Sequence, residues 1–429
     1  MDGHRLVSRR TMLAAAAAGA IPASGFAWHL FSSSAQLQSS AADETNADAV
    51  RPTDTWNPII RVNLTPNEIQ ELTISVDSPF RIVVPGNPRV LAQSDPVREV
   101  FASAASNGIG IRFGDSILPV NQIEIVAIRP VSIRVGRSLY RGSVRLHRRP
   151  SGKLIAVNVL PLEEYLASVV NSEMPASFPD AAREAQTIAA RTYALSQMKG
   201  HPLFDVFGSS RSQMYLGYEY RDADGRRLAG ETPDSREIIR DTAGIVCTYQ
   251  GKIFTTWYSA VCGGQTVNGR SVFTDAVPAL RSVECDWCRE AKLYRWTSEL
   301  PVAQASDALR QHLAKDNLVF RELTSLEPAQ VESGDLPRYT IGDGTNRHQI
   351  AGTTLRRVLP SAVLRSPHFT GQIEGNVVKL SGRGDGHGVG LCQWGARGLG
   401  IAGRSALEIL GYYYSGIETV RLRTPEPSG

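Results

Sequence analysis

The segment 160–195, LPLEEYLASVVNSEMPASFPDAAREAQTIAARTYAL, constrains the fold more than any other part of the chain. Its apolar residues first recur at helical spacing. This pattern predicts a helix that ends close to Glu173, because Pro175 disfavours the α conformation at the residue before it. A second helix is predicted to begin with Asp180 as its N-cap and to end with Gly200 as its C-cap. The segment therefore predicts two consecutive helices, with Glu173 at the end of the first.

Glu173 is a candidate catalytic acid because of this position. A carboxyl group at a helix end, flanked by apolar residues, can have its pKa raised enough to serve as a general acid. The alternative for any single glutamate is a solvated surface carboxylate. Glu163 and Glu164, earlier in the same helix, are expected to form such a solvated face.

Four ordered blocks of the sequence resemble the SpoIID/LytB family, bacterial cell-wall proteins that include lytic transglycosylases acting on peptidoglycan. The likeness extends over residues 59–423 and is weaker before Val131. The resemblance implies that Glu173 is the catalytic acid/base and that Arg191 belongs to the same site. The blocks are LPLEEYLASVVNSEMP (160–175), EAQTIAARTYAL (184–195), TYQGKIFTTWYSAVCGGQT (248–266) and GRGDGHGVGLCQWGA (382–396).

The number of carboxylates decides which glycan cleavage is expected. Hydrolases generally pair the acid with a second carboxylate. A lytic transglycosylase can work with one, because the 6-hydroxyl of the sugar attacks the anomeric carbon and leaves a 1,6-anhydro-muramyl end. Only Asp385 is a rival partner acid, at a position where the family often has an apolar or aromatic residue. We therefore expect a peptidoglycan lytic transglycosylase. The alternative is a non-catalytic cell-wall-binding protein that enhances an N-acetylmuramoyl-L-alanine amidase, which would then be its partner.

Further site residues are suggested mainly by the resemblance. Arg191, in the middle of the second helix, would hold Glu173 or bind substrate, or else be a structural partner of a carboxylate. The glycine-rich stretch 384–390 indicates a backbone that passes close to another group, and it lacks the lysine of a phosphate loop. The alternatives for its histidine are a structural hydrogen bond and a substrate contact. By resemblance, Tyr258 and His387 are expected in a substrate groove. Gln393 and Trp394 could add a polar contact and a sugar-stacking face to it, although a buried tryptophan is the commoner outcome.

Four of the five cysteines form a second candidate cluster. Cys285 and Cys288 make a CxxC motif, and Cys262 and Cys392 lie in two of the family-like blocks. Four thiolates could hold one structural zinc that takes no part in the chemistry, and His387 could replace one of them. Two disulfides are the competing interpretation for an exported protein. Cys247 lies in a strand pattern and is expected to be a buried free thiol.

The N-terminus has the pattern of a targeting segment. The stretch SRRTML from Ser8 resembles a twin-arginine export signal and is followed by an uncharged, alanine-rich run. Residues 1–31 are therefore predicted to be a signal peptide or a membrane anchor, and residues 32–55 a disordered linker. The protein should act outside the cytoplasm, in the periplasm or cell wall. A net charge of +4 over 429 residues, without basic runs, argues against nucleic acid as a partner.

Short strand patterns such as IIRVNL, ELTISV and VSIRV, mixed irregularly with helices and hairpins, predict an α+β fold of the SpoIID type. Residues 150–152 should form a hairpin turn, and the polar stretch 204–230 a surface excursion that could contact substrate. We expect a small β-rich subdomain over residues 56–130 and a SpoIID-like catalytic domain over residues 131–425.

Overall fold

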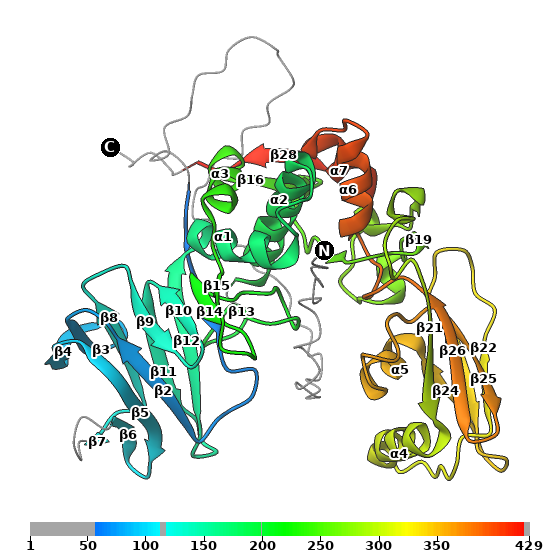
Figure 1. Cartoon of the computed structure of the whole chain (residues 1–429), viewed down its shortest axis with the longest axis horizontal. Coiled ribbons are helices and arrows are strands. Elements are labelled where there is room, and N and C mark those ends of the chain that lie inside the picture. Colours follow the sequence, from blue (N-terminus) through cyan, green and yellow to red (C-terminus); the bar gives the residue numbers. More distant parts are fainter. Residues whose placement is uncertain (1–55, 112–116, 199, 424–429) are drawn as a thin grey trace, which may run out of the picture. The chain divides into compact units, whose positions relative to one another are not determined.

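A computed structural model describes residues 56–111, 117–198 and 200–423 (Figure 1). The α+β class is confirmed, since both helices and mixed sheets are present. The described chain forms two compact units. The N-terminal unit comprises residues 56–255 and 418–423, and the C-terminal unit is Thr256–Ile417. The predicted segments 1–31 and 32–55 lie outside the described residues. Within the described ranges, no helix has the length and apolar character needed to cross a bilayer.

Two sheets make up the first part of the N-terminal unit. Their strands are β1 (Ile59–Asn63), β2 (Glu71–Val76), β3 (Phe80–Val84), β4 (Asn87–Ser94), β5 (Val97–Ala105), β6 (Gly108–Ile111), β7 (Ile117–Leu118), β8 (Gln122–Ala127), β9 (Val131–Val135), β10 (Ser138–Arg141), β11 (Ser143–Arg148), β12 (Leu154–Pro161), β13 (Val206–Phe207), β14 (Glu219–Arg221) and β15 (Arg227–Ala229). One sheet has the order β13-β1-β12-β11-β8-β3-β4, and the other has the order β15-β14-β10-β9-β2-β5-β6-β7.

The two sheets share one hydrophobic core. Residues of β2 alternate between buried and less buried positions, as expected for a strand with one face on a core, and Ile74 packs in the same cluster as Ile82 of the other sheet. Strand β12 is buried on both faces: Ala156 packs in this core, whereas Val157 packs with Phe204 on the opposite side. The predicted turn joins β11 to β12, with Gly152 at φ 72°, a left-handed conformation that glycine adopts readily.

The first helix of the N-terminal unit follows directly from β12. The helices of this unit are α1 (Leu162–Glu173), α2 (Asp180–Gln197) and α3 (Pro233–Asp241), accompanied by a small sheet of β16 (Ile245–Tyr249), β17 (Lys252–Ile253) and β28 (Glu418–Arg421). Helix α1 ends at Glu173, as predicted. The limits of α2 differ slightly: its N-cap is Pro179 rather than Asp180, and its C-cap is Met198 rather than Gly200.

The predicted boundary between residues 130 and 131 falls inside the two sheets. Strand β9 pairs with β2, and β11 pairs with β8, so segments on either side of that boundary form common sheets. The polar stretch 204–230 is likewise not a simple surface excursion, because it contributes β13 to one sheet and β14 and β15 to the other. Strand pairing between distant segments, which local sequence patterns do not encode, accounts for both differences.

The C-terminal unit has its own core, built from residues of its strands and helices such as Leu300, Leu309 and Tyr339. Ser405 and Glu408 form the capping box at the start of its last helix. Its helices are α4 (Val302–Leu313), α5 (Gly352–Val358), α6 (Gln393–Ile401) and α7 (Ala406–Tyr413). Its strands are β18 (Tyr258–Ser259), β19 (Gly264–Gln265), β20 (Glu284–Cys285), β21 (Arg295–Pro301), β22 (Ser325–Pro328), β23 (Arg338–Gly342), β24 (Arg347–Ala351), β25 (Phe369–Glu374), β26 (Val377–Arg383) and β27 (Leu391–Cys392).

Candidate functional site

Glu173 is the last residue of α1 and is half-buried. The chain leaves the helix at Met174, which has the extended conformation (φ −124°, ψ 136°) that a following proline favours. Carboxylate atom Oε1 of Glu173 accepts a hydrogen bond of 2.8 Å from the backbone N–H of Met214. The carboxyl group is therefore held at a defined place at the end of α1.

The segment that supplies this N–H is itself fixed to α1. The hydroxyl of Tyr165 donates to Oε1 of Gln213 at 3.1 Å, and the hydroxyl of Ser168 accepts from the N–H of Leu216 at 3.2 Å. Gln213 is fully buried, as is Tyr165. Side chains from two successive turns of α1 thus hydrogen-bond to residues on both sides of Met214. The backbone N–H that donates to Glu173 is therefore held in a fixed segment.

Tyr215 anchors the same segment to the sheet. It is 3% exposed, its ring lies 5.0 Å from that of Tyr165, and its hydroxyl donates to Oδ1 of Asn158 at 2.7 Å. Burial raises the pKa of both tyrosines well above the ordinary value, and the charge of Glu173 adds to the effect on Tyr165. Both hydroxyls therefore keep their protons and act as donors. Sequence analysis missed this role of residues 213–216, because they lie in a stretch interpreted as a surface excursion and no local sequence pattern distinguishes them.

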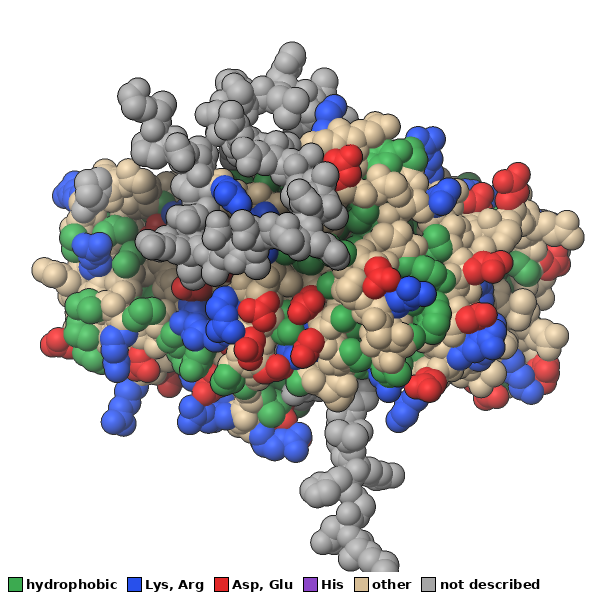
Figure 2. Space-filling model, turned by 90° about the horizontal axis from the view of Figure 1, so that it is seen from above, with side chains coloured by type: hydrophobic (Ala, Val, Ile, Leu, Met, Phe, Trp, Pro, Cys, Tyr) green, Lys and Arg blue, Asp and Glu red, His purple; other side chains and the backbone are tan. Residues whose placement is uncertain are grey.

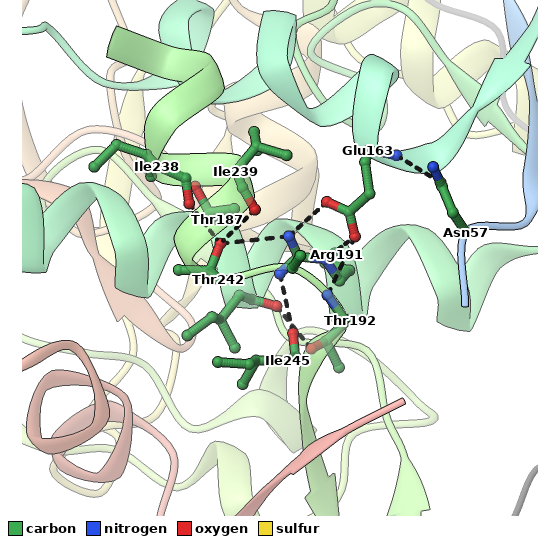
Figure 3. A network of polar contacts seen from close by, with 12 residues as sticks. Asn57, Glu163, Thr187, Arg191, Thr192, Ile238, Ile239, Thr242 and Ile245 are labelled. Atoms are coloured by element: carbon green, nitrogen blue, oxygen red, sulfur yellow. Dashed lines mark hydrogen bonds and ion pairs between the residues drawn. The ribbon is translucent and has the colours of Figure 1, made fainter. Parts of the chain in front are cut away.

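Arg191 pairs with Glu163 in this structure (Figure 3). Its Nε and Nη2 atoms donate to the two carboxylate oxygens at 2.8 and 2.7 Å, and Nη1 donates to the carbonyl of Ile245 at 3.1 Å. The side chain of Arg191 is 1% exposed and that of Glu163 is 14% exposed. The expectation that Glu163 lies on a solvated face is therefore wrong, because α2 and the turn before β16 cover it.

Because Arg191 pairs with Glu163, it contacts the opposite end of α1 from Glu173. Glu163 and Glu173 lie at opposite ends of the helix, ten residues or about 15 Å apart at the usual rise per residue. Of the two readings of Arg191, the structure displays the structural pairing with a carboxylate. Its membership of a catalytic site with Glu173 stays a prediction.

The remaining candidate residues belong to the C-terminal unit, where two of the family-like blocks interleave. Tyr258 in β18 pairs with Leu391 in β27, and isolated bridges join Val261 to Asp385 and Val267 to Val389. Close backbone contact explains the glycines of the second block: Gly390 has φ 70°, and a Cβ atom there would lie 2.0 Å from the carbonyl oxygen of Trp257.

His387 is held by its own unit. Its Nδ1 atom accepts the N–H of Val389 at 3.1 Å, and the ring donates a second hydrogen bond to the backbone of Tyr258. Its ring lies edge-on to Trp257 and Phe273, which stack with centroids 3.7 Å apart. Burial, helped by the charge of Arg356, lowers the pKa of His387 to about 3, so the ring is neutral at pH 7. Structural hydrogen bonds thus account for this histidine in the structure.

Gln393 and Trp394 open helix α6. Gln393 is 4% exposed, whereas Trp394 is half-buried, with the guanidinium of Arg397 lying 5.3 Å from the centre of one of its rings. The backbone N–H of Trp394 donates to the carbonyl of Ala260 at 3.1 Å. The tryptophan ring is therefore the more accessible of the two side chains. Their contact with substrate stays a prediction.

The structure separates one cysteine, Cys247, from a cluster formed by the other four. Cys247 is a fully buried free thiol in β16, as predicted, and burial raises its pKa to about 12. The sulfur atoms of Cys262, Cys285, Cys288 and Cys392 all lie within 4.8 Å of one another in the C-terminal unit. All five cysteines are free thiols in the structure.

Acidic and basic side chains are mixed over the visible face of the molecule (Figure 2), in keeping with the small net charge of +4.

Comparison with known proteins identifies the family. Residues 150–249, which carry α1, α2 and α3, match the model of the SpoIID family, described as stage II sporulation protein. An uncharacterized protein of Brachyspira hyodysenteriae is 32% identical over 271 residues, covering 62% of this chain and 68% of that protein. Stage II sporulation protein D of Bacillus subtilis is 27% identical over 272 residues, covering 61% of this chain and 75% of that protein. The amidase enhancer of Bacillus subtilis is 26% identical over 293 residues, covering 58% and 39% respectively. The chain belongs to the SpoIID family.

Proposed function

We propose that the protein is a peptidoglycan lytic transglycosylase in which Glu173 acts as general acid and then as general base. Membership of the SpoIID family supports a function at the bacterial cell wall. The observation that carries the catalytic proposal is the fixed carboxyl group at the end of α1, held by the N–H of Met214 at 2.8 Å. A positioned carboxyl group is the minimum that proton transfer to a glycosidic oxygen requires.

The proposed reaction needs no second carboxylate and no water. The Glu173 carboxyl group protonates the glycosidic oxygen as the bond from that oxygen to the anomeric carbon of the muramyl sugar breaks. The 6-hydroxyl oxygen of the same sugar then bonds to the anomeric carbon, and its proton passes to the Glu173 carboxylate. The products are a 1,6-anhydro-muramyl end and a free hydroxyl on the departing sugar, and Glu173 regains its starting form.

The other acid of α1 with a well-defined place supports this assignment. Glu163 is engaged by two nitrogen atoms of Arg191, so its carboxylate serves the packing of α1 on α2. Asp385 keeps its place as a rival partner acid, in the C-terminal unit.

A second function is favoured by the relative named amidase enhancer. In that case the protein binds the cell wall and stimulates an N-acetylmuramoyl-L-alanine amidase without cleaving glycan itself. The same fixed Glu173 could then contribute to binding alone. The two functions differ in whether the purified chain cleaves peptide-free glycan.

The test is the substitution Glu173→Gln, with Glu164→Gln as the matched control in the same helix. Purified protein is incubated with peptide-free glycan strands, and the new ends are identified by mass spectrometry. We expect 1,6-anhydro-muramyl ends from the wild type and from Glu164→Gln, and a loss of at least about 10²-fold in Glu173→Gln, because an amide cannot deliver the proton.

Other outcomes discriminate clearly. Reducing ends as the main product would mean that water is the nucleophile, and Asp385→Asn would be tested next. The wild type could instead leave glycan intact but stimulate an amidase on whole peptidoglycan, with the same stimulation by Glu173→Gln. That result would reject the transglycosylase and favour the amidase enhancer.

We further propose that the protein acts outside the cytoplasm, carried there by residues 1–31. Changing Arg9 and Arg10 to lysine should leave the protein in the cytoplasm, since a twin-arginine pathway reads that pair. Fractionation of cells that express both versions tests this, and equal export of the two would contradict it.

A further inference from the structure

We infer that Cys262, Cys285, Cys288 and Cys392 form a tetrathiolate zinc centre in the C-terminal unit. The inference does not depend on the proposed function, since the centre lies among buried residues and the proposed reaction makes no use of it. It gives a structural role to four side chains that take no part in the proposed glycan cleavage.

The first support is the convergence of the sulfur atoms. All four lie within 4.8 Å of one another, and those of Cys262 and Cys288 are 3.6 Å apart. Four ligands at about 2.3 Å from a tetrahedral zinc ion lie about 3.5–4 Å from each other, so the arrangement needs only a small contraction. A pair of disulfides would instead draw the sulfurs into two bonded couples.

The second support is where the ligands come from. Cys285 ends β20 and Cys288 ends the 3-10 turn Asp286–Cys288 that follows it, so the CxxC presents two sulfurs from one tight turn. Cys262 and Cys392 come from the two interleaved family-like blocks. All four cysteines are at most 4% exposed. Such a closed, all-sulfur set is typical of structural zinc sites.

The third support is the set of hydrogen-bond donors aimed at the sulfurs. Sγ of Cys392 accepts the backbone N–H groups of Cys262 and Gly395, each at 3.3 Å. The hydroxyl of Tyr413 lies 3.1 Å from Sγ of Cys285. A neutral thiol is a weak acceptor, whereas a metal-bound thiolate carries charge that such donors stabilise.

Gly395 shows how tightly this outer layer is built. A Cβ atom there would lie 1.9 Å from the hydroxyl oxygen of Tyr413 and 2.7 Å from Sγ of Cys285. The absence of a side chain lets the start of α6 approach the sulfurs closely. A zinc ion would therefore fasten the CxxC turn to the strand β27 and to the helix that begins with Gln393 and Trp394.

His387 is not a member of the cluster. The group of metal-ligating side chains found among the described residues contains the four cysteines alone, and Nδ1 of His387 is engaged by the N–H of Val389. The earlier alternative in which His387 replaces a cysteine therefore gains no support.

The experiment measures zinc and thiols on the same sample of the full chain, purified without chelator or reducing agent. We expect about one equivalent of zinc by elemental analysis, and five alkylatable thiols by mass spectrometry after denaturation with chelator. The matched control Cys247→Ala removes a buried thiol outside the cluster and should keep the zinc equivalent. Cys288→Ser should lose most of it.

Tyr413→Phe provides a variant that keeps all four ligands and is expected to fold. Losing the hydroxyl beside Cys285 should weaken zinc affinity about 10–100-fold in a competition with a chromophoric chelator, the usual effect of an outer-layer change. Less than about a tenth of an equivalent of zinc in the wild type would overturn the proposal. This holds whether one thiol is alkylated, which would indicate two disulfides, or all five are. One equivalent of another metal in its place would overturn the assignment to zinc.

Discussion

The buried ion pair between Arg191 and Glu163 offers a sharp test of what Arg191 does. Replacing Arg191 by Met leaves the Glu163 carboxylate in a site where it is 14% exposed and has lost two charge-assisted hydrogen bonds. Breaking such a pair from one side destabilises by about 3–5 kcal/mol. Because 1.4 kcal/mol is a factor of ten, local opening of α1 and α2 should become about 10²- to 4 × 10³-fold more frequent.

The assay is amide hydrogen exchange measured by mass spectrometry, on peptides from residues 160–197 and, as an internal reference, on peptides from β21 and β26. Exchange should accelerate in the first set and stay unchanged in the second. The double variant Arg191→Met with Glu163→Leu should recover most of the loss, since a matched apolar pair avoids the buried unpaired charge. The control is the exposed pair of Arg240 and Glu237, where Arg240→Met should change stability by less than about 1 kcal/mol.

One result would refute the structural reading of Arg191. If Arg191→Met left exchange of α1 and α2 within about threefold of the wild type while glycan cleavage collapsed, the guanidinium would act on substrate or on Glu173. The resemblance-based prediction for Arg191 would then be favoured.

Two further predictions concern stability. His147, 6% exposed in β11, has its pKa lowered to about 4, chiefly by burial and then by nearby arginines. The unfolded state therefore binds more protons between pH 6.5 and 4, and the free energy of unfolding should fall by up to about 3 kcal/mol as the pH drops through that window. Urea unfolding at several pH values should show a flatter pH dependence for His147→Phe than for the wild type. An unchanged slope would contradict this prediction. Gly390→Ala should destabilise the C-terminal unit by more than about 2 kcal/mol, because it adds a clash with the carbonyl of Trp257 to a strained φ. Gly403→Ala, with φ 82° and nothing within 4 Å of the added Cβ atom, should cost only about 1 kcal/mol. Similar unfolding of the two variants would show that the clash is relieved by backbone movement.

Local sequence rules determined the features that depend on neighbours along the chain. Pro175 sets the end of α1 at Glu173, since its ring restricts only the preceding residue. The same holds for the turn at Gly152 and for the capping box of Ser405 and Glu408, whose members are three positions apart. The burial of Cys247 followed from its place in an apolar strand.

The tertiary structure decided whatever joins residues far apart in sequence. Arg191 meets Glu163 across 28 positions, Met214 reaches Glu173 across 41, and Cys392 receives the N–H of Cys262 across 130. No periodicity or spacing encodes such contacts, because they arise only when helices and sheets pack. The sequence by itself therefore indicated Glu173 and the four cysteines as candidates. Only the packed chain paired Arg191 with Glu163, turned the stretch 204–230 into support for α1, and brought four sulfurs to one centre.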